Sequence, residues 1–233
     1  MSDVVRYELQ GTTAVVRMDD GKANALSEAM ISSLIEGLSR AKQEASAVVL
    51  TGRADRFCAG FDLKVMTAGP EGVQKLFLHG ARMLVKLFGF PLPVVMACTG
   101  HAMAGGAQLL LTADVRIGAA GPYRIGLNET TIGLPLPVLG VEFARARLAP
   151  TELTRATLAA KIYGPEDAVK AGYLDEVRPA AEVLPRALEE AAALGALSKQ
   201  AYAATKQRLR GKVLAEVEAT LESDMKSLLG LFG

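Results

Sequence analysis

The sequence has few of the side chains on which many enzyme classes depend. It contains two histidines, His79 and His101, two cysteines, Cys58 and Cys98, and no tryptophan in 233 residues. A serine hydrolase needs a histidine beside its nucleophile, but no GxSxG stretch is present, and the place of His101 after a turn glycine favours a structural role. The cysteines match no metal-ligand spacing and make no disulfide framework. We therefore expect no metal site and a reducing compartment.

Several longer patterns are also missing. Neither a GxGxxG fingerprint nor a Walker loop occurs, which argues against dinucleotide and nucleoside triphosphate chemistry. The 26 basic and 25 acidic residues nearly cancel, so no charge field points to nucleic acid or a membrane surface as a partner. The first residues, MSDVVRYELQ, carry charges where a signal peptide needs apolar residues, and no uninterrupted apolar run approaches about 18 residues. These absences predict a cytoplasmic protein.

Apolar residues make up half of the chain, which is enough for one well-buried core. Their spacing predicts alternating strands and helices, and hence an α/β protein with buried strands. The elements expected first are a hairpin of residues 4–9 and 14–18, a helix that begins at the N-cap Ser27, a strand over residues 47–51, a loop over residues 52–60, and a helix over residues 71–88 whose apolar stripe includes Val73 and Phe77.

Residues 94–114, VVMACTGHAMAGGAQLLLTAD, predict a strand, a tight loop and a buried helix. A strand over residues 115–119 follows, and Pro135 and Pro137 force an irregular backbone. Helices are expected over residues 138–148, 151–160 and 165–171, and everything beyond residue 181 has the pattern of helix. A shift in composition near Pro179 predicts an α/β core over residues 1–178 and a helical C-terminal region over residues 179–233.

Two glycine-marked loops each follow an apolar strand. One contains Ala59, Gly60 and Phe61, and the other contains Gly105 and Gly106 at the start of a helix. Loops that follow neighbouring parallel strands meet at one edge of a sheet, so their backbone N–H groups can converge on an anion or an oxyanion. Tight turns and close helix packing explain the same glycines equally well.

Three stretches in this order and spacing, FCAGFDL, TGHAMAGGAQLLLTADVRIG and IGLNETTIGLPLP, resemble the enoyl-CoA hydratase/isomerase family, also called the crotonase family. The resemblance extends from about residue 4 to about residue 177. It implies a crotonase-like spiral of strand–strand–helix turns with a helical C-terminal region that builds trimers, often paired into hexamers. It also implies an enzyme of fatty-acid metabolism that acts on acyl-CoA thioesters and needs no cofactor, because coenzyme A is part of the substrate.

The resemblance also implies roles for individual residues. The backbone N–H groups of Phe61 and Gly105 are expected to bind the thioester oxygen, and residues 22–26 match the adenine-side loop of the family. The full set of residues implied to bind acyl-CoA is Ala23, Ala59, Phe61, Asp62, Leu63, Lys64 and Gly105.

The two acid/base positions of the family carry different residues in this chain. Hydratases have a glutamate at both positions, whereas this chain has Gln108 at the first and Glu129 at the second. An amide cannot take up a proton in the working pH range, but a single carboxylate suffices to move a double bond. The resemblance therefore favours an isomerase that converts 3-enoyl-CoA to 2-enoyl-CoA, with Glu129 as base and acid. Ile125, Ile132 and Leu134 around Glu129 are expected to raise its pKa.

Other interpretations stay open at this point. Gln108 also fits a buried, hydrogen-bonded amide, and Glu129 fits a carboxylate that caps a helix start. The alternatives to an isomerase are an enoyl-CoA hydratase, a non-catalytic acyl-CoA-binding homologue, and a thioester hydrolase or decarboxylase on the same fold.

Overall fold

Two sheets form the centre of the computed structural model, which describes residues 4–62 and 69–229. The larger sheet has the strand order β1-β2-β3-β5-β7-β9, in which only the β1–β2 pair is antiparallel. The smaller sheet is parallel and has the order β4-β6-β8. The strands are β1 Val5–Gln10, β2 Thr13–Met18, β3 Ala47–Thr51, β4 Asp55–Cys58, β5 Val94–Cys98, β6 Gly100–Met103, β7 Val115–Ala119, β8 Ile125–Gly126 and β9 Glu176–Arg178.

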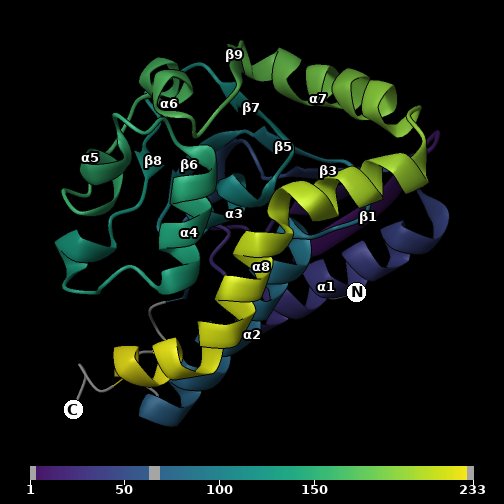
Figure 1. Ribbon diagram of the computed structural model, residues 1–233. Coiled ribbons are helices and arrows are strands. Elements are labelled where there is room, and N and C mark those ends of the chain that lie inside the picture. The colour runs from purple at the N-terminus through teal and green to yellow at the C-terminus, as the bar shows by residue number, and fades with distance from the viewer. Residues whose placement is uncertain (1–3, 63–68, 230–233) are drawn as a thin grey trace.

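Helices surround these sheets (Figure 1). In chain order they are α1 Glu28–Glu44, α2 Pro70–Phe88, α3 Gly105–Thr112, the 3₁₀ helix η2 Glu129–Ile132, α4 Val138–Arg147, α5 Leu153–Thr157, α6 Pro165–Ala171, α7 Ala180–Gly195 and α8 Lys199–Leu229. No helix within residues 4–62 and 69–229 is both long and apolar enough to cross a membrane.

The chain repeats one unit as it builds the core. In each repeat a strand of the large sheet is followed by a strand of the small sheet and then by a helix, as in β3-β4-α2 and β5-β6-α3. The unit β7-β8-η2 continues the pattern up to α4. This is the predicted α/β spiral of strand–strand–helix turns, and the repeats bring the ends of β4, β6 and β8 side by side.

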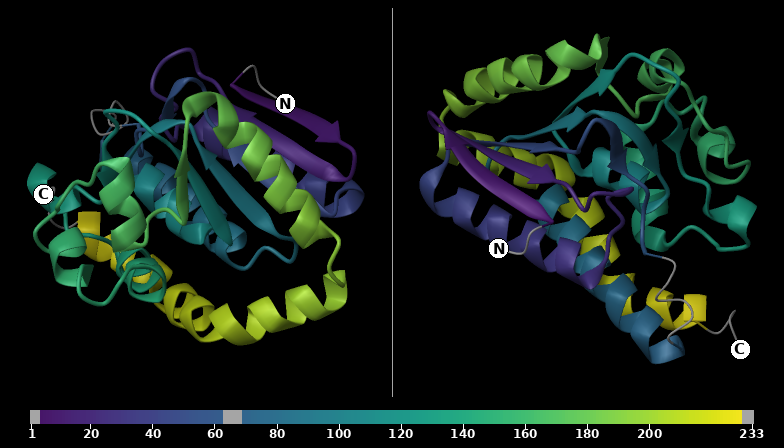
Figure 2. Two further views of the ribbon diagram at one scale, coloured as in Figure 1. Left: turned by 90° about the horizontal axis from the view of Figure 1, so that it is seen from above. Right: turned by 180° about the vertical axis from the view of Figure 1, so that it is seen from behind.

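The central strands β3 and β5 of the large sheet are buried on both faces. Side chains on a strand alternate between these faces. On β3, Val48 and Leu50 belong to the main core under the surrounding helices, while Ala47 and Val49 face the other way. That second face is covered by α7, as the left view of Figure 2 shows. The C-terminal helices therefore pack on the core directly. The division into residues 1–178 and 179–233 stays a prediction.

Most predicted elements agree with the structure. The hairpin, the strands β3, β5 and β7, and the helices α2 and α3 form where the pattern placed them. Ser27 caps α1 by accepting a hydrogen bond from the N–H of Met30. Helix α5 is shorter than predicted, at Leu153–Thr157.

Two predicted loops were wrong. Residues 55–58 form β4 and residues 100–103 form β6, although both lie in segments predicted as loops. These strands have four residues each and exist because they pair with each other in register, Asp55 with Gly100 and Arg56 with His101. A pairing between such distant segments leaves no local hydrophobic pattern.

Candidate active site

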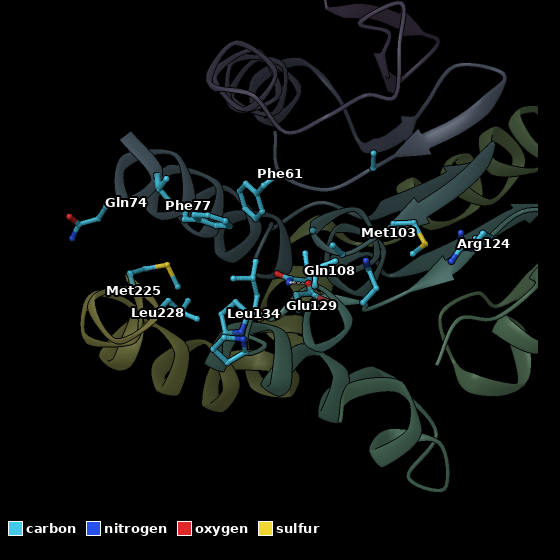
Figure 3. Close-up of a pocket in the computed structure, with 18 residues that line it drawn as sticks. Phe61, Gln74, Phe77, Met103, Gln108, Arg124, Glu129, Leu134, Met225 and Leu228 are labelled. Carbon is cyan, nitrogen blue, oxygen red and sulfur yellow. Dashed lines mark hydrogen bonds between the residues drawn. The ribbon is translucent and has the colours of Figure 1, made fainter. Parts of the chain in front are cut away.

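A cavity of about 340 Å³ opens beside the ends of the small sheet's strands. Figure 3 shows Arg124 at one end of the cavity and Met225 and Leu228 at the other, with Gln108 and Glu129 between them. The lining residues come from the loop after β4, from α2, α3, η2 and the segment before α4, and from α8. The strand–strand–helix turns thus bring segments between residues 59 and 137 to one place, and the C-terminal part of α8 joins them there.

In the loop after β4, the backbone N–H of Phe61 points away from the neighbouring segment, which contains Leu26. The N–H of Leu26 donates to the carbonyl of Gly60 at 2.8 Å, and the N–H of Asp62 donates to the carbonyl of Leu26 at 3.4 Å. Leu26 and Phe61 are therefore partners in a parallel β-bridge. The middle residue of such a bridge directs its own N–H to the opposite side. Because Phe61 lines the cavity, its amide is a candidate donor there.

The start of α3 supplies a second candidate donor. Gly105 is the first residue of α3, so its N–H has no acceptor within the helix and lies at the positive end of the helix dipole. Gly60, with a φ of 93°, lies so close that a Cβ there would be 3.1 Å from the Gly105 nitrogen. A Cβ on Gly106 would lie 2.1 Å from the carbonyl oxygen of Cys58. The two glycine-marked loops are thus in contact.

Gln108 and Glu129 form a buried pair in the cavity wall. The Nε2 atom of Gln108, on α3, donates to Oε1 of Glu129, the first residue of η2, at 2.8 Å. The exposed fractions of Gln108 and Glu129 are only 2% and 7%. The second oxygen of Glu129, Oε2, has no hydrogen-bond partner among the described residues. In this pair, Oε1 of the Glu129 carboxylate therefore accepts a hydrogen bond from Gln108, while Oε2 has no such partner among the described residues.

Burial raises the pKa of Glu129 above its ordinary value. Hydrogen bonds from backbone N–H groups and from Gln108 act in the opposite direction but do not cancel the effect of burial. Of the three apolar residues predicted around this carboxylate, Ile132 and Leu134 line the same cavity, whereas Ile125 lies in the core and is not among the lining residues. A carboxylate with a raised pKa is a stronger base, which suits it to remove a proton from carbon.

Known proteins share both the sequence pattern and the fold. The sequence profile of the enoyl-CoA hydratase/isomerase family matches residues 8–232. The chain belongs to the enoyl-CoA hydratase/isomerase family. A relative from Rhodobacter capsulatus, named "Probable enoyl-CoA hydratase", is 31% identical over 230 residues, which cover 97% of this chain and 89% of the relative.

Two solved structures of the family superimpose closely on this chain. An enoyl-CoA hydratase/isomerase family protein from Pseudomonas syringae is 37% identical, with a TM-score of 0.94 and coverage of 97% of this chain and 98% of the other. Human mitochondrial delta3-delta2-enoyl-CoA isomerase is 26% identical, also with a TM-score of 0.94, and the match covers 98% of this chain and 91% of the human chain. The α/β fold with its helical C-terminal region is therefore the fold of this family.

The structure brings most of the predicted site residues to the cavity. Phe61, Gly105, Gln108, Glu129 and Ala59 all line it.

Two further predicted residues, Ala23 and Asp62, are not among the lining residues. Ala23 contacts the lining residue Ala59, because the carbonyl of Ala23 accepts a hydrogen bond from the N–H of Ala59 at 3.1 Å. Asp62 joins Leu26 through its backbone and is not among the lining residues. Leu63 and Lys64 lie outside the described residues.

Sequence reasoning missed the residues that line the two ends of the cavity. Met225 and Leu228 reach it from α8, and Arg124 reaches it from the segment before β8. Phe77 was predicted as part of an apolar helical stripe, but it lines the cavity instead of lying wholly in the core. Its spacing marked it as apolar, and nothing in that spacing separates a pocket wall from a core.

Proposed function

We propose that the protein is an enoyl-CoA isomerase, which shifts the double bond of a 3-enoyl-CoA to give the 2-enoyl-CoA. The observation that carries this proposal is that Glu129, hydrogen-bonded to Gln108, is the only carboxylate among the described residues that line the cavity. By the resemblance to the family, Gln108 stands at the position where hydratases have their other glutamate. Membership of the family supports acyl-CoA thioesters as the substrate class.

The proposed reaction needs one group that first takes a proton and then returns it. Glu129 Oε2 removes a proton from C2 of the 3-enoyl thioester, and the electrons of the C–H bond delocalise into a dienolate. The N–H groups of Phe61 and Gly105 stabilise the charge that develops on the thioester oxygen. Protonated Glu129 then delivers the same proton to C4. The double bond moves from C3=C4 to C2=C3, and the carboxylate is regenerated.

Hydration makes a further demand on the site. A water molecule must be activated for attack on C3 while a proton is supplied to C2, and the family divides these tasks between two carboxylates. The side-chain amide of Gln108 hydrogen-bonds to Glu129 and cannot accept a proton in the working pH range. The chemistry of this pair therefore favours isomerisation over hydration.

Other parts of the proposal rest on the resemblance to the family and, for the location, on the features of the sequence alone. Acyl-CoA is the expected partner, with no cofactor beyond the coenzyme A of the substrate, and Ala23 and Asp62 stay candidates for contacts with it. The cytoplasm as location and a homotrimer or a dimer of trimers as assembly are also proposed, and sedimentation analysis of the purified protein tests the assembly.

The test is to incubate the protein separately with 3-enoyl-CoA, 2-enoyl-CoA and 3-hydroxyacyl-CoA. We expect conjugated thioester to form from 3-enoyl-CoA, and little interconversion of 2-enoyl-CoA and 3-hydroxyacyl-CoA. Equal or faster hydration contradicts the preference for isomerisation. Binding of acyl-CoA with no turnover of any of the three substrates contradicts an enzymatic role.

A further inference from the structure

The C-terminal part of α8 forms a wall of the cavity in its own chain. Leu221, Asp224, Met225 and Leu228 follow one another at helical spacing and therefore share one face of α8. Met225 and Leu228 line the cavity, and Met225 is only 3% exposed. Figure 1 shows α8 running beside α2 and α4 toward this end of the molecule. The wall thus depends on how this face of α8 is held against the rest of the fold.

Asp224 makes the polar contact on that face. Its Oδ2 atom accepts a hydrogen bond of 2.7 Å from the N–H of Val138, which is the first residue of α4. The N-cap residue of α4 is Pro137, which has no side chain able to cap the helix. The carboxylate of Asp224 therefore satisfies an N–H that the helix leaves unpaired, and its charge lies at the favourable end of the helix dipole.

The segment before α4 connects this contact to the catalytic carboxylate. The N–H of Leu134 donates to the carbonyl of Glu129 at 3.0 Å, and Leu134, Pro135 and Pro137 line the cavity. The two prolines have no N–H, so this segment has few backbone donors with which to hold its position. The hydrogen bond from Val138 to Asp224 ties its far end to α8.

We propose that Asp224 is a positioning residue, which holds the α8 wall and the segment before α4 together around the far end of the acyl chain. This inference rests on the proposed function for its ligand, an acyl-CoA. The occupant fits because Phe77, Leu134 and Met225 give this end of the cavity a mainly apolar wall, with Gln74 as its polar side chain, whereas Glu129 lies nearer the centre of the cavity. A short acyl group ends near Glu129, and a longer one reaches α8.

Binding of saturated acyl-CoAs tests this proposal, because these ligands cannot be isomerised. Each buried methylene strengthens binding by about fourfold, so we expect the wild-type protein to bind octanoyl-CoA at least about tenfold more tightly than butyryl-CoA in calorimetric titrations. In Asp224→Ala, octanoyl-CoA should lose about tenfold in affinity while butyryl-CoA changes by less than about twofold. Asp224→Asn keeps an oxygen that accepts from Val138 and should restore most of the loss.

Glu222→Ala is the matched control. It removes an acid from the exposed side of the same helix, where Glu222 pairs with Arg82 at 3.3 Å, and it should affect neither ligand. Should Asp224→Ala fail to fold, Met225→Trp fills the same end of the cavity and should weaken octanoyl-CoA alone. Equal losses for both ligands, no loss for either, or no chain-length preference in the wild type overturns the proposal. These results are independent of whether the isomerase assay succeeds.

Discussion

Gln108 holds Glu129 by one oxygen only, through the 2.8 Å hydrogen bond from Nε2 to Oε1. Oε2 is buried and has no hydrogen-bond partner among the described residues, so it is the oxygen proposed to act as the base. The two side chains are contributed by different turns of the spiral, α3 and η2. Their contact therefore joins two turns of the spiral at the carboxylate that is the proposed base.

Glu129→Gln should abolish most of the isomerase activity. The substituted amide keeps the shape of the side chain but cannot accept the C2 proton, and general-base catalysis is typically worth about 10²- to 10⁴-fold. We therefore expect kcat for 3-enoyl-CoA to fall by at least about 10²-fold, with affinity for acyl-CoA nearly unchanged. Steady-state kinetics and a binding titration measure the two effects. Full turnover in this variant rules out Glu129 as the base.

The pH profile should report the raised pKa of Glu129. Only the carboxylate form acts as base, so kcat/KM should fall as the pH is lowered through a pKa that lies above the ordinary value of 4.5. The hydrogen bond from Gln108 favours the charged form. Gln108→Met removes it, and the midpoint of the acidic limb should move to higher pH.

Gln74→Met is the control for this shift, because Gln74 also lines the cavity but lies at one end of it, away from Glu129. Its pH profile should match that of the wild type. A midpoint for Gln108→Met that stays in place or moves to lower pH contradicts the proposed coupling between the two side chains.

Gln108→Glu should create or increase hydratase activity. The new carboxylate restores the pair that hydration of 2-enoyl-CoA requires, one group for the water and one for the C2 proton. The side chain at position 108 packs closely against α4, since a Cβ added to Gly140 would lie 3.4 Å from Cδ of Gln108. Glutamate fits the same space because it matches glutamine in size. Loss of absorbance from the conjugated thioester measures the gain. No gain in a variant that folds and binds acyl-CoA shows that the site cannot hold the attacking water.

Gly60→Ala should impair the two proposed amide donors together. The added Cβ would lie 3.1 Å from the Gly105 nitrogen and 2.9 Å from the carbonyl oxygen of Met103, and the φ of 93° is unfavourable for alanine. Loss of one oxyanion donor typically costs about 10²- to 10³-fold in rate, so kcat should fall by that order. Gly164→Ala is the control, because nothing lies within 4 Å of its added Cβ. Equal activity of the two variants contradicts the assigned donors.

The parts of the fold that could be predicted from the sequence are those with a local cause. The cap that Ser27 provides and the buried strand β3 follow from residue type and spacing within one segment. Strands β4 and β6 do not, because each is defined by its partner in a distant segment.

The candidate site also contains residues that could be predicted from the sequence and residues that could not. Motifs that resemble the family placed Gly105, Gln108 and Glu129, and the structure brings all three to one cavity. Met225 could not be found in this way, because an apolar residue on a long helix has the same spacing whether it faces a core or a pocket. Tertiary packing alone determines which surface α8 covers.

Asp114→Asn should destabilise the attachment of α8 to the core. The two oxygens of Asp114 lie 2.6 Å from Nζ of Lys206 and 2.9 Å from a guanidinium nitrogen of Arg210, and all three side chains are largely buried. Asparagine can still accept the hydrogen bond from the N–H of Val94, but the substitution removes the charge and the acceptor oxygen that faces Arg210. Loss of one partner from a buried ion pair typically costs about 3–5 kcal/mol. Urea denaturation at pH 7 should show a loss of this order.

The folding stability of Asp114→Asn should also depend on pH differently from that of the wild type. Burial lowers the pKa of Lys206 to about 8 although Asp114 opposes this effect, so without the carboxylate the pKa falls further. An unfolded lysine keeps its proton up to a pH of about 10.5. Between the two pKa values the unfolded state binds more protons, so stability rises with pH, and in Asp114→Asn this rise should begin at lower pH than in the wild type. Asp167→Asn removes an acid that pairs with Lys170 on the surface and should change neither stability nor its pH dependence. If Asp114→Asn is as stable as the wild type from pH 7 to 9, the ion pairs of Asp114 do not hold α8 in place.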